Sequence, residues 1–192
     1  MLISIIWFIS LILAPLTLPP DSIRLGDNGK ANTIDYLDKW QKLPLYQRMI
    51  YMLGDLGCHQ KSSRSFFING NQMPVCSRCF GIFTGLAITL PLLYVLEKKY
   101  NEIYVQFTNM LFSKYRKIWF IVYFLSITPL LIDFFTQFLG LRESSNFIRF
   151  TTALPFTVSN TILFYHYLLE DNKWTVRYPY FNEKELKIKK SL

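Results

Sequence analysis

The residues best suited to chemistry form a compact cluster of thiols and one imidazole. All three cysteines of the chain, and one of its two histidines, lie between positions 58 and 79. The cluster consists of Cys58, His59, Cys76 and Cys79. Thiolates and imidazoles are the ligands that zinc prefers, and a tetrahedral site needs four of them. Because Cys76 and Cys79 also have the C-x-x-C spacing, the sequence predicts a zinc site formed by these residues.

The adjacent pair Cys58 and His59 leaves the number of ligands open. Neighbouring residues point in different directions in any regular element, so both reach one ion only through a turn, which Gly57 permits. If only three residues bind, the fourth position is free for water or substrate, as in catalytic zinc sites. The same cysteines can also be small, buried and chemically inert.

A redox centre is a further interpretation of the cysteine pair. Pro74 has the position of a first-turn proline, which places Cys76 and Cys79 on one side of the first turn of a helix. A helix N-terminus and a neighbouring arginine, here Arg78, both lower the pKa of a thiol. The layout is similar to that of quinone-coupled disulfide-forming enzymes, although those use two cysteine pairs. Cys58 would then act as a lone resolving thiol.

Composition indicates that membrane helices position these residues. Of 192 residues, 51% are hydrophobic and 18% are charged, and the mean hydropathy is +0.20. These values exclude a disordered chain and are too apolar for an ordinary soluble domain. Four segments are close to the roughly 20 residues that a helix needs to cross the bilayer. The segments are residues 2–19, 80–96, 118–139 and 148–169. We expect an all-α integral membrane protein with four transmembrane helices.

The chain divides into four parts on this interpretation. Residues 1–19 form an N-terminal transmembrane helix, which we expect to be uncleaved because no Lys or Arg precedes its apolar run. Residues 20–56 form a polar linker followed by an amphipathic surface helix over residues 35–56. Residues 57–169 form a membrane domain with three further spans, and residues 170–192 form a basic tail.

The net charge of +8 indicates contact with the lipid bilayer rather than with nucleic acid. Basic residues are dense in the short connection after the second span and in the C-terminal tail. Positive residues near span ends favour the cytoplasmic side, so we expect both termini in the cytoplasm and the protein in the plasma membrane. The oligomeric state has no signature in the sequence.

A second polar cluster begins inside the third predicted span. An ionisable residue there, Asp133, costs roughly 3 kcal/mol on insertion unless it is paired. Gln137 lies four residues on and shares its helix face. The connection to the fourth span adds Arg142, Asn146 and Arg149. Since an even number of spans separates the two clusters, they lie on the same side of the membrane and can form one site.

The polar cluster has a functional and a structural interpretation. In the first, Asp133 is a general acid, a general base or a metal ligand, while Arg142 and Arg149 bind an anionic group such as a lipid phosphate. Arg64, Gln137 and Asn146 complete the substrate-binding set. In the second, an ion pair between Asp133 and Arg149 only locks two helices together. The chain has no serine-hydrolase, phosphate-loop or dinucleotide motif.

Both clusters resemble motifs of a family of prokaryotic membrane proteins known only as a domain of unknown function. The first motif has three parts. They are a Cys-His-Gln box, matched at residues 58–60, an Arg-Ser-Phe sequence, matched at residues 64–66, and a Pro-Val-Cys-x-Arg-Cys-x-Gly-Ile stretch, matched at residues 74–82. The other is matched by Asp133, Thr136, Gln137, Gly140, Arg142, Ser145, Asn146 and Arg149. The similarity covers about residues 57–169. It implies one membrane fold and one combined site, and it implies no reaction.

Three functions therefore follow from the sequence. The first is a zinc-dependent membrane enzyme that acts on an anionic or lipid-derived substrate. The second is a membrane thiol–disulfide oxidoreductase that uses Cys76 and Cys79. The third is a non-enzymatic membrane subunit or scaffold in which the cysteine cluster only stabilises a loop.

Overall fold

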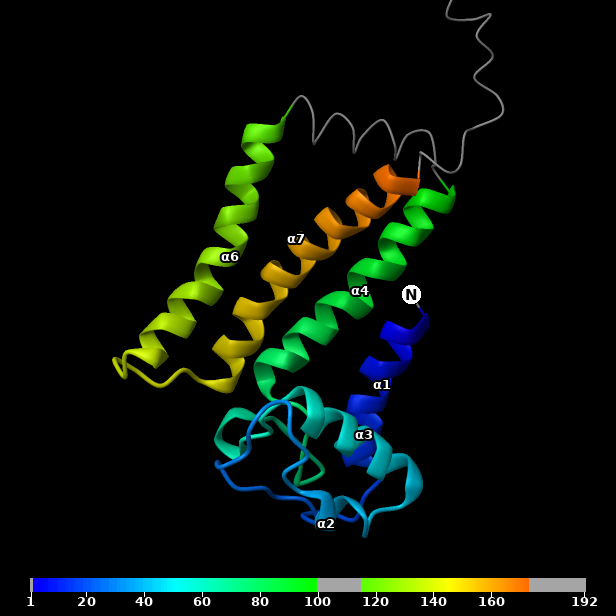
Figure 1. The fold of residues 1–192 in the computed structure, drawn as a ribbon, viewed down its shortest axis with the longest axis vertical. Coiled ribbons are helices and arrows are strands. Elements are labelled where there is room, and N and C mark those ends of the chain that lie inside the picture. Colours follow the sequence, from blue (N-terminus) through cyan, green and yellow to red (C-terminus); the bar gives the residue numbers. More distant parts are fainter. Residues whose placement is uncertain (1, 100–114, 173–192) are drawn as a thin grey trace, which may run out of the picture.

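Helices make up most of the computed structural model, which describes residues 2–99 and 115–172. Four of them run alongside one another in Figure 1. They are α1 (Leu2–Leu16), α4 (Ser77–Lys99), α6 (Arg116–Phe138) and α7 (Asn146–Asn172). A smaller unit of short elements caps one end of this bundle, at the bottom of Figure 1. The connection between α6 and α7 lies at that same end, which brings it near the start of α4.

Two of the described helices are long and apolar enough to cross a membrane, over Ser77–Lys99 and Lys117–Phe138. The structure thus places a helix in each of the four predicted segments and marks two of these as candidate spans. Helix α1 has only 15 residues. Helix α7 has 27, and its threonine hydroxyls donate to carbonyls one turn earlier, as Thr157 does to Ala153 at 2.9 Å and Thr161 to Thr157 at 2.7 Å. Such bonds satisfy the hydroxyls within the helix.

Two glycines allow α4 and α7 to pack closely. A Cβ atom at Gly81 would lie 2.6 Å from the carbonyl oxygen of Phe150, and one at Gly85 would lie 2.8 Å from Cβ of Thr157. Small residues four positions apart permit this approach between membrane helices. Helix α6 joins the other side of α7, where the Tyr123 hydroxyl donates to Oδ1 of Asn160 at 3.1 Å.

The unit at the end of the bundle has its own apolar core. It contains α2 (Leu37–Trp40), α3 (Leu45–Gly57), the 3-10 helix η1 (Ser62–Arg64) and a hairpin of β1 (Phe67–Ile68) and β2 (Asn71–Gln72). Trp40 stacks on Tyr51 with ring centroids 4.9 Å apart, and both are fully buried. Asn69 and Gly70 form the hairpin turn with positive φ angles of 54° and 72°. An Asn-Gly pair is typical of such two-residue turns.

The region expected to be a polar linker and one surface helix is packed against the hairpin. The backbone N–H groups of Ile23 and Leu25 donate to the side-chain oxygens of Asn71 and Gln72, at 2.9 and 3.0 Å. The helical part is divided into α2 and α3, because Pro44 lacks an N–H group and keeps Leu43 out of the helical region. These bonds make the end unit a compact support for the residues that follow α3.

Candidate metal centre

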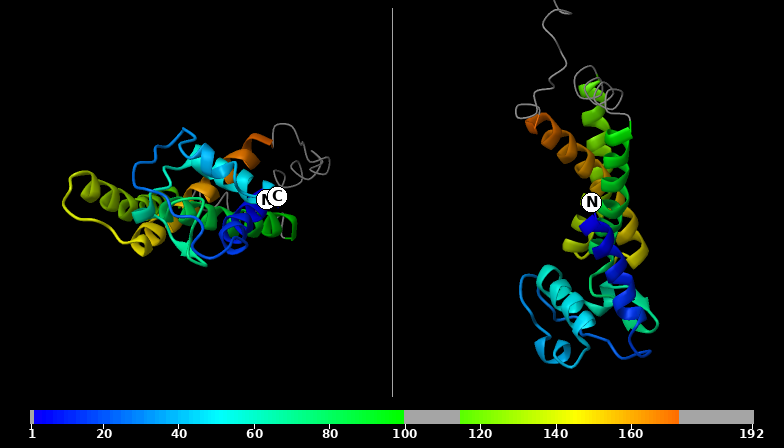
Figure 2. Two further views of the ribbon diagram at one scale, coloured as in Figure 1. Left: turned by 90° about the horizontal axis from the view of Figure 1, so that it is seen from below. Right: turned by 90° about the vertical axis from the view of Figure 1, so that its right-hand side faces the viewer.

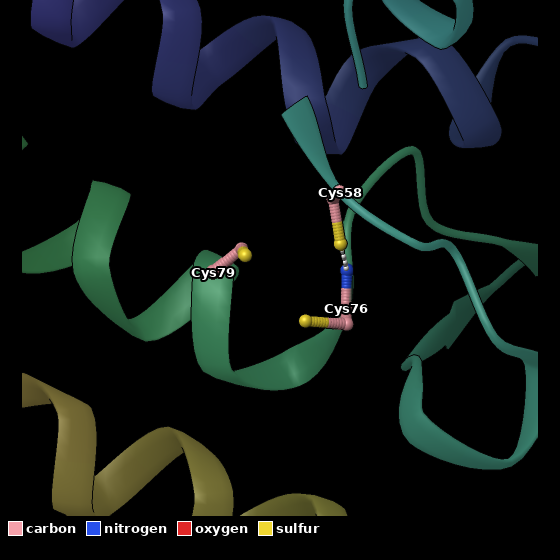
Figure 3. A group of neighbouring side chains, drawn as sticks. All are labelled: Cys58, Cys76 and Cys79. Atoms are coloured by element: carbon pink, nitrogen blue, oxygen red, sulfur yellow. Dashed lines mark hydrogen bonds between the residues drawn. The ribbon is translucent and has the colours of Figure 1, made fainter. Parts of the chain in front are cut away.

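The three cysteines come together from two separate stretches of chain. Cys58 directly follows α3, Cys76 directly precedes α4, and Cys79 lies in the first turn of α4. Their sulfur atoms all lie within 4.8 Å of one another, and Figure 3 shows them facing a common space. In a tetrahedral zinc site the Zn–S bond of about 2.3 Å separates the sulfurs by roughly 3.8 Å. Small side-chain rotations therefore suffice to place the three sulfurs around one ion.

Burial and a backbone donor distinguish the three thiols. Cys58 and Cys76 are 3% and 5% exposed, and Cys79 is half-buried. The N–H group of Cys76 donates to Sγ of Cys58 at 3.2 Å, which is the dashed line in Figure 3. A donor aimed at a sulfur stabilises the charged thiolate over the neutral thiol. This donor therefore favours the charged form of Cys58 relative to the same thiol without it. Cys79 is the most accessible of the three sulfurs.

The thiols shift each other's proton affinity. Hydrogen bonds from the Cys58 and Cys79 thiols hold the pKa of Cys76 far below its ordinary value, and the side chain of His59 lowers it further. The hydrogen bond to Cys76, together with burial, raises the pKa of Cys58 to about 11. One thiolate therefore forms readily, while a second buried negative charge requires compensation by a cation.

His59 lies beside the cluster rather than within it. The group of mutually close ligand atoms contains the three sulfurs and not the imidazole. Nδ1 of His59 accepts the N–H of Lys61 at 3.3 Å. This arrangement differs from the predicted set of four ligands, because the backbone turns His59 away from the direction of Cys58. Its side chain interacts with Cys76.

The start of α4 differs from the predicted position. The expectation that Pro74 opens this helix is wrong, since α4 begins at Ser77. Cys76 caps the helix, and its carbonyl oxygen accepts the N–H of Phe80 at 2.8 Å. The carbonyl of Pro74 is used differently, as an acceptor for the side-chain amide of Gln60 at 2.6 Å. Cys76 and Cys79 consequently flank the helix start, one before it and one inside its first turn.

Two buried glutamines hold the segments that carry the cysteines. Nε2 of Gln60 donates to the carbonyls of Tyr51 and Pro74, and Nε2 of Gln72 donates to the carbonyl of Gln60 at 2.6 Å. Gly54 permits the close contact, because a Cβ atom there would lie 2.1 Å from the Pro74 oxygen. Sequence reasoning assigned Gln60 no role, although its position directly after Cys58 and His59 was a signal.

The polar cluster is centred on Asp133, whose side chain is 1% exposed. It forms an ion pair with Arg78, the residue before Cys79, and a longer one with Arg142 at 3.6 Å. Nε2 of Gln137 donates to the carboxylate at 2.8 Å. The pairing of Asp133 with Arg149, which was the structural alternative, is absent from the ion pairs of the described residues. Arg78 occupies that place because α4 presents it directly to α6.

Arg149 is bound by neutral oxygens instead. Its guanidinium donates to Oε1 of Gln137 at 3.1 Å, to Oδ1 of Asn146 at 3.2 Å and to the carbonyl of Ser63 at 3.5 Å. The side chain is only 5% exposed. Gln137 therefore connects Arg149 to Asp133, with its oxygen on the arginine and its nitrogen on the carboxylate.

The two clusters form one continuous site. Ser77 Oγ donates to the carbonyl of Arg64 at 3.0 Å and to Oδ1 of Asn146 at 3.2 Å. Asn146 Nδ2 in turn donates to the carbonyl of Ser65 at 2.9 Å. The two residues inside the C-x-x-C motif, Ser77 and Arg78, thus contact α7 and α6. The views of Figure 2 agree that the helix ends meet at the end unit.

The fold and this site define a helical protein with two candidate transmembrane helices and a cluster of three cysteines that can hold a metal ion. The chain belongs to the DUF2085 family of predicted membrane proteins, whose family model matches residues 58–163. The matched range includes all three cysteines and the polar cluster.

Two archaeal proteins are similar to this chain. An uncharacterized protein from Methanocaldococcus jannaschii is 37% identical over 116 residues, which cover 60% of this chain and 65% of the relative. Another uncharacterized protein, from Methanothermobacter thermautotrophicus, is 36% identical over 106 residues, or 55% of this chain and 82% of the relative. No solved structure matches the chain.

Proposed function

We propose that the protein is a membrane protein that binds one zinc ion through Cys58, Cys76 and Cys79. The observation that carries this proposal is the approach of three sulfurs, from two separate segments, to within 4.8 Å of one another. A hydrophobic core needs no such convergence of thiols. Two further features support it, namely the backbone donor on Cys58 and the lowered pKa of Cys76. The lowered pKa favours a thiolate at Cys76, the form that binds zinc, and the backbone donor would stabilise a metal-bound thiolate at Cys58.

Three cysteines leave the fourth coordination position for another ligand. His59, which lies beside Cys76, is one candidate, and a water molecule or a substrate group is the other. A zinc ion with an open position supplies an activated water or polarises a bound oxygen. On this proposal the protein is a zinc-dependent enzyme for an anionic or lipid-derived substrate. Arg64, Gln137, Arg142, Asn146 and Arg149 would hold that substrate, and Asp133 orients the arginines.

We further propose that α1, α4, α6 and α7 all lie in the membrane, with both termini in the cytoplasm. The end unit and the α6–α7 connection share one end of the bundle, as an even number of spans requires (Figure 1). Lys98, Lys99 and Lys117 lie at the helix ends away from the site. Basic residues at span ends favour the cytoplasmic side. The cysteines, at the opposite end of the bundle, would then lie on the outer side of the plasma membrane.

A thiol–disulfide oxidoreductase is the second candidate. The lowered pKa of Cys76 and its position at a helix N-terminus are the observations that favour it. Exchange with a partner protein needs an accessible sulfur, and Cys58 and Cys76 are almost fully buried. Only Cys79 meets this requirement in part, so the zinc centre agrees better with the geometry.

Elemental analysis of the detergent-purified protein tests the proposal. We expect about one zinc per chain, with thiols protected until a chelator is added. We expect most of this zinc to be lost in each of the variants Cys58→Ser, Cys76→Ser and Cys79→Ser. The control is Thr84→Ser in α4, where the Thr84 hydroxyl donates to the Phe80 carbonyl, and this variant should keep its zinc. Unchanged zinc in all three cysteine variants would overturn the proposal.

The same sample separates the remaining functions. Loss of zinc in His59→Ala would identify the imidazole as the fourth ligand, and retention would leave that position open. Absence of metal together with one free thiol would indicate a disulfide and hence redox chemistry. Absence of metal with three free thiols would favour the scaffold function.

A further inference from the structure

Arg149 is a buried cation without a negative partner. Arg149 is 5% exposed, and among the described residues its guanidinium donates to amide and carbonyl oxygens. Within residues 2–99 and 115–172, no carboxylate lies within ion-pair distance of it. A buried charge is costly unless an opposite charge compensates it. The site therefore contains a positive charge that the described protein residues leave uncompensated.

Further arginines increase this positive charge. Arg64 and Arg78 lie near enough to Arg149 to repel it, and Asp133 is the carboxylate that attracts it. Arg142 reaches the same carboxylate from the exposed side. Three thiolates around a divalent ion would add one more negative charge. Asp27 lies near Arg64 and Lys61, and both of these cations lower its pKa. With these two groups included, five cations face three negative charges, so two positive charges remain.

Several donors of the cluster have no acceptor. The Nε atom of Arg78 is buried and makes no hydrogen bond with any residue that the structure describes. Arg64 is half-buried, and its guanidinium forms no hydrogen bond or ion pair with the residues that the structure describes. Both arginines act electrostatically on Arg149, so donors without an acceptor lie near this buried cation, as a bound anion requires.

The first turns of two helices point into the same region. Helix α4 begins at Ser77 and α7 begins at Asn146, and the side chains of these two residues hydrogen-bond each other. Helix N-termini carry partial positive charge and free N–H groups, which favour anions. Their meeting point adds to the field of the arginines.

We propose that Arg64, Arg78 and Arg149 bind a phosphate monoester beside the cysteine cluster. A phosphate monoester carries about −1.5 to −2 charges near neutral pH, which matches the two uncompensated positive charges. Its oxygens accept bidentate hydrogen bonds from guanidinium groups. The inference rests on the proposed function, because the metal-bound thiolates set the remaining charge. The phosphate can belong to a soluble molecule or to a lipid headgroup.

Binding of inorganic phosphate and of phosphatidic acid tests this inference. Phosphate is titrated calorimetrically into the zinc-loaded, detergent-purified protein, and retention of phosphatidic acid is compared with that of phosphatidylcholine by native mass spectrometry. We expect Arg149→Gln to weaken binding about tenfold or more, since it removes a charged donor, and Arg149→Lys to restore part of it. Lys117→Gln, an exposed cation at the opposite end of α6, is the matched control and should bind normally.

The outcomes show whether the phosphate belongs to a soluble molecule or to a lipid headgroup. They also separate failure of the phosphate site from failure of the zinc centre. Binding of both probes supports a site open to soluble phosphates, and binding of phosphatidic acid alone supports a lipid headgroup. Binding of neither probe, or wild-type binding by Arg149→Gln, overturns the inference. If Arg149→Gln does not fold, Arg64→Gln replaces it, because the Arg64 guanidinium forms no hydrogen bond or contact ion pair with the residues that the structure describes. Zinc content measured on each sample shows whether the metal centre persists when phosphate binding fails.

Discussion

Arg78, which lies between two cysteines of the candidate metal centre, forms an ion pair with Asp133 on the neighbouring helix. This contact ties the first turn of α4 to the middle of the polar cluster. Because the carboxylate is buried and Gln137 also binds it, this ion pair joins the start of α4, next to Cys79, to α6. The same contact explains how an acidic residue is tolerated in a candidate transmembrane helix.

The Arg78–Asp133 pair should contribute to stability. Asp133→Asn leaves the guanidinium of Arg78 without its counter-charge, and breaking such a buried pair costs about 3 kcal/mol. Thermal unfolding in detergent measures the effect. The double variant Arg78→Gln with Asp133→Asn should lose less stability than the two single variants combined. Strict additivity would show that the two residues are not energetically coupled.

Gln60 should support the metal centre without being a ligand. Gln60→Ala removes two hydrogen bonds, to the carbonyls of Tyr51 and Pro74, and takes from the Pro74 carbonyl the donor that holds it against α3. We expect a loss of about 1–3 kcal/mol in stability and faster release of zinc to a chelator. Gln60→Glu should be worse, since a carboxylate would face two carbonyl oxygens. Normal zinc release by both variants would contradict a supporting role.

The close packing of α4 on α7 should tolerate no added side chain at Gly81. Gly81→Ala places a methyl group against the Phe150 carbonyl and Ala153, which should cost about 1–3 kcal/mol. Gly57→Ala is the matched control, because nothing lies within 4 Å of its Cβ position. That control should be neutral or stabilising by up to about 1 kcal/mol. Equal unfolding temperatures for both variants would contradict the packing.

Stability should depend on pH through Asp55. Burial raises the pKa of this carboxyl, although the Trp40 indole N–H and the Tyr36 backbone N–H bind one of its oxygens. A raised folded-state pKa means that stability present at low pH is lost as pH rises through that pKa. Asp55→Asn keeps an acceptor and carries no charge, so its stability relative to wild type should increase between acidic and neutral pH. A difference that is constant with pH would contradict this assignment.

The joining of the two clusters could be predicted from the sequence because it follows from topology. An even number of apolar segments separates Cys79 from Arg149, and C-x-x-C spacing keeps two thiols together wherever the helix begins. The partner of Asp133 could not be predicted in this way. Asp133 pairs with Arg78 rather than with Arg149 because of how α4 is rotated about its axis. That rotation depends on the close contacts of Gly81 and Gly85 with α7.

Local rules also failed where a backbone carbonyl had a distant partner. Pro74 has the character of a first-turn residue, yet its carbonyl accepts the amide of Gln60, the chain bends at Pro74 and Val75, and the helix begins only at Ser77. His59 was grouped with the cysteines by residue type, while its direction is set by the turn after α3. Such directions depend on hydrogen bonds between segments far apart in sequence, for which a single sequence has no pattern.

X-ray absorption at the zinc edge of the purified protein shows whether three cysteine sulfurs bind one zinc ion. We expect about three sulfur neighbours at about 2.3 Å and one lighter neighbour, nitrogen or oxygen. Zinc surrounded only by nitrogen and oxygen, or a protein that retains no zinc while its three thiols react freely, would contradict the proposed zinc centre.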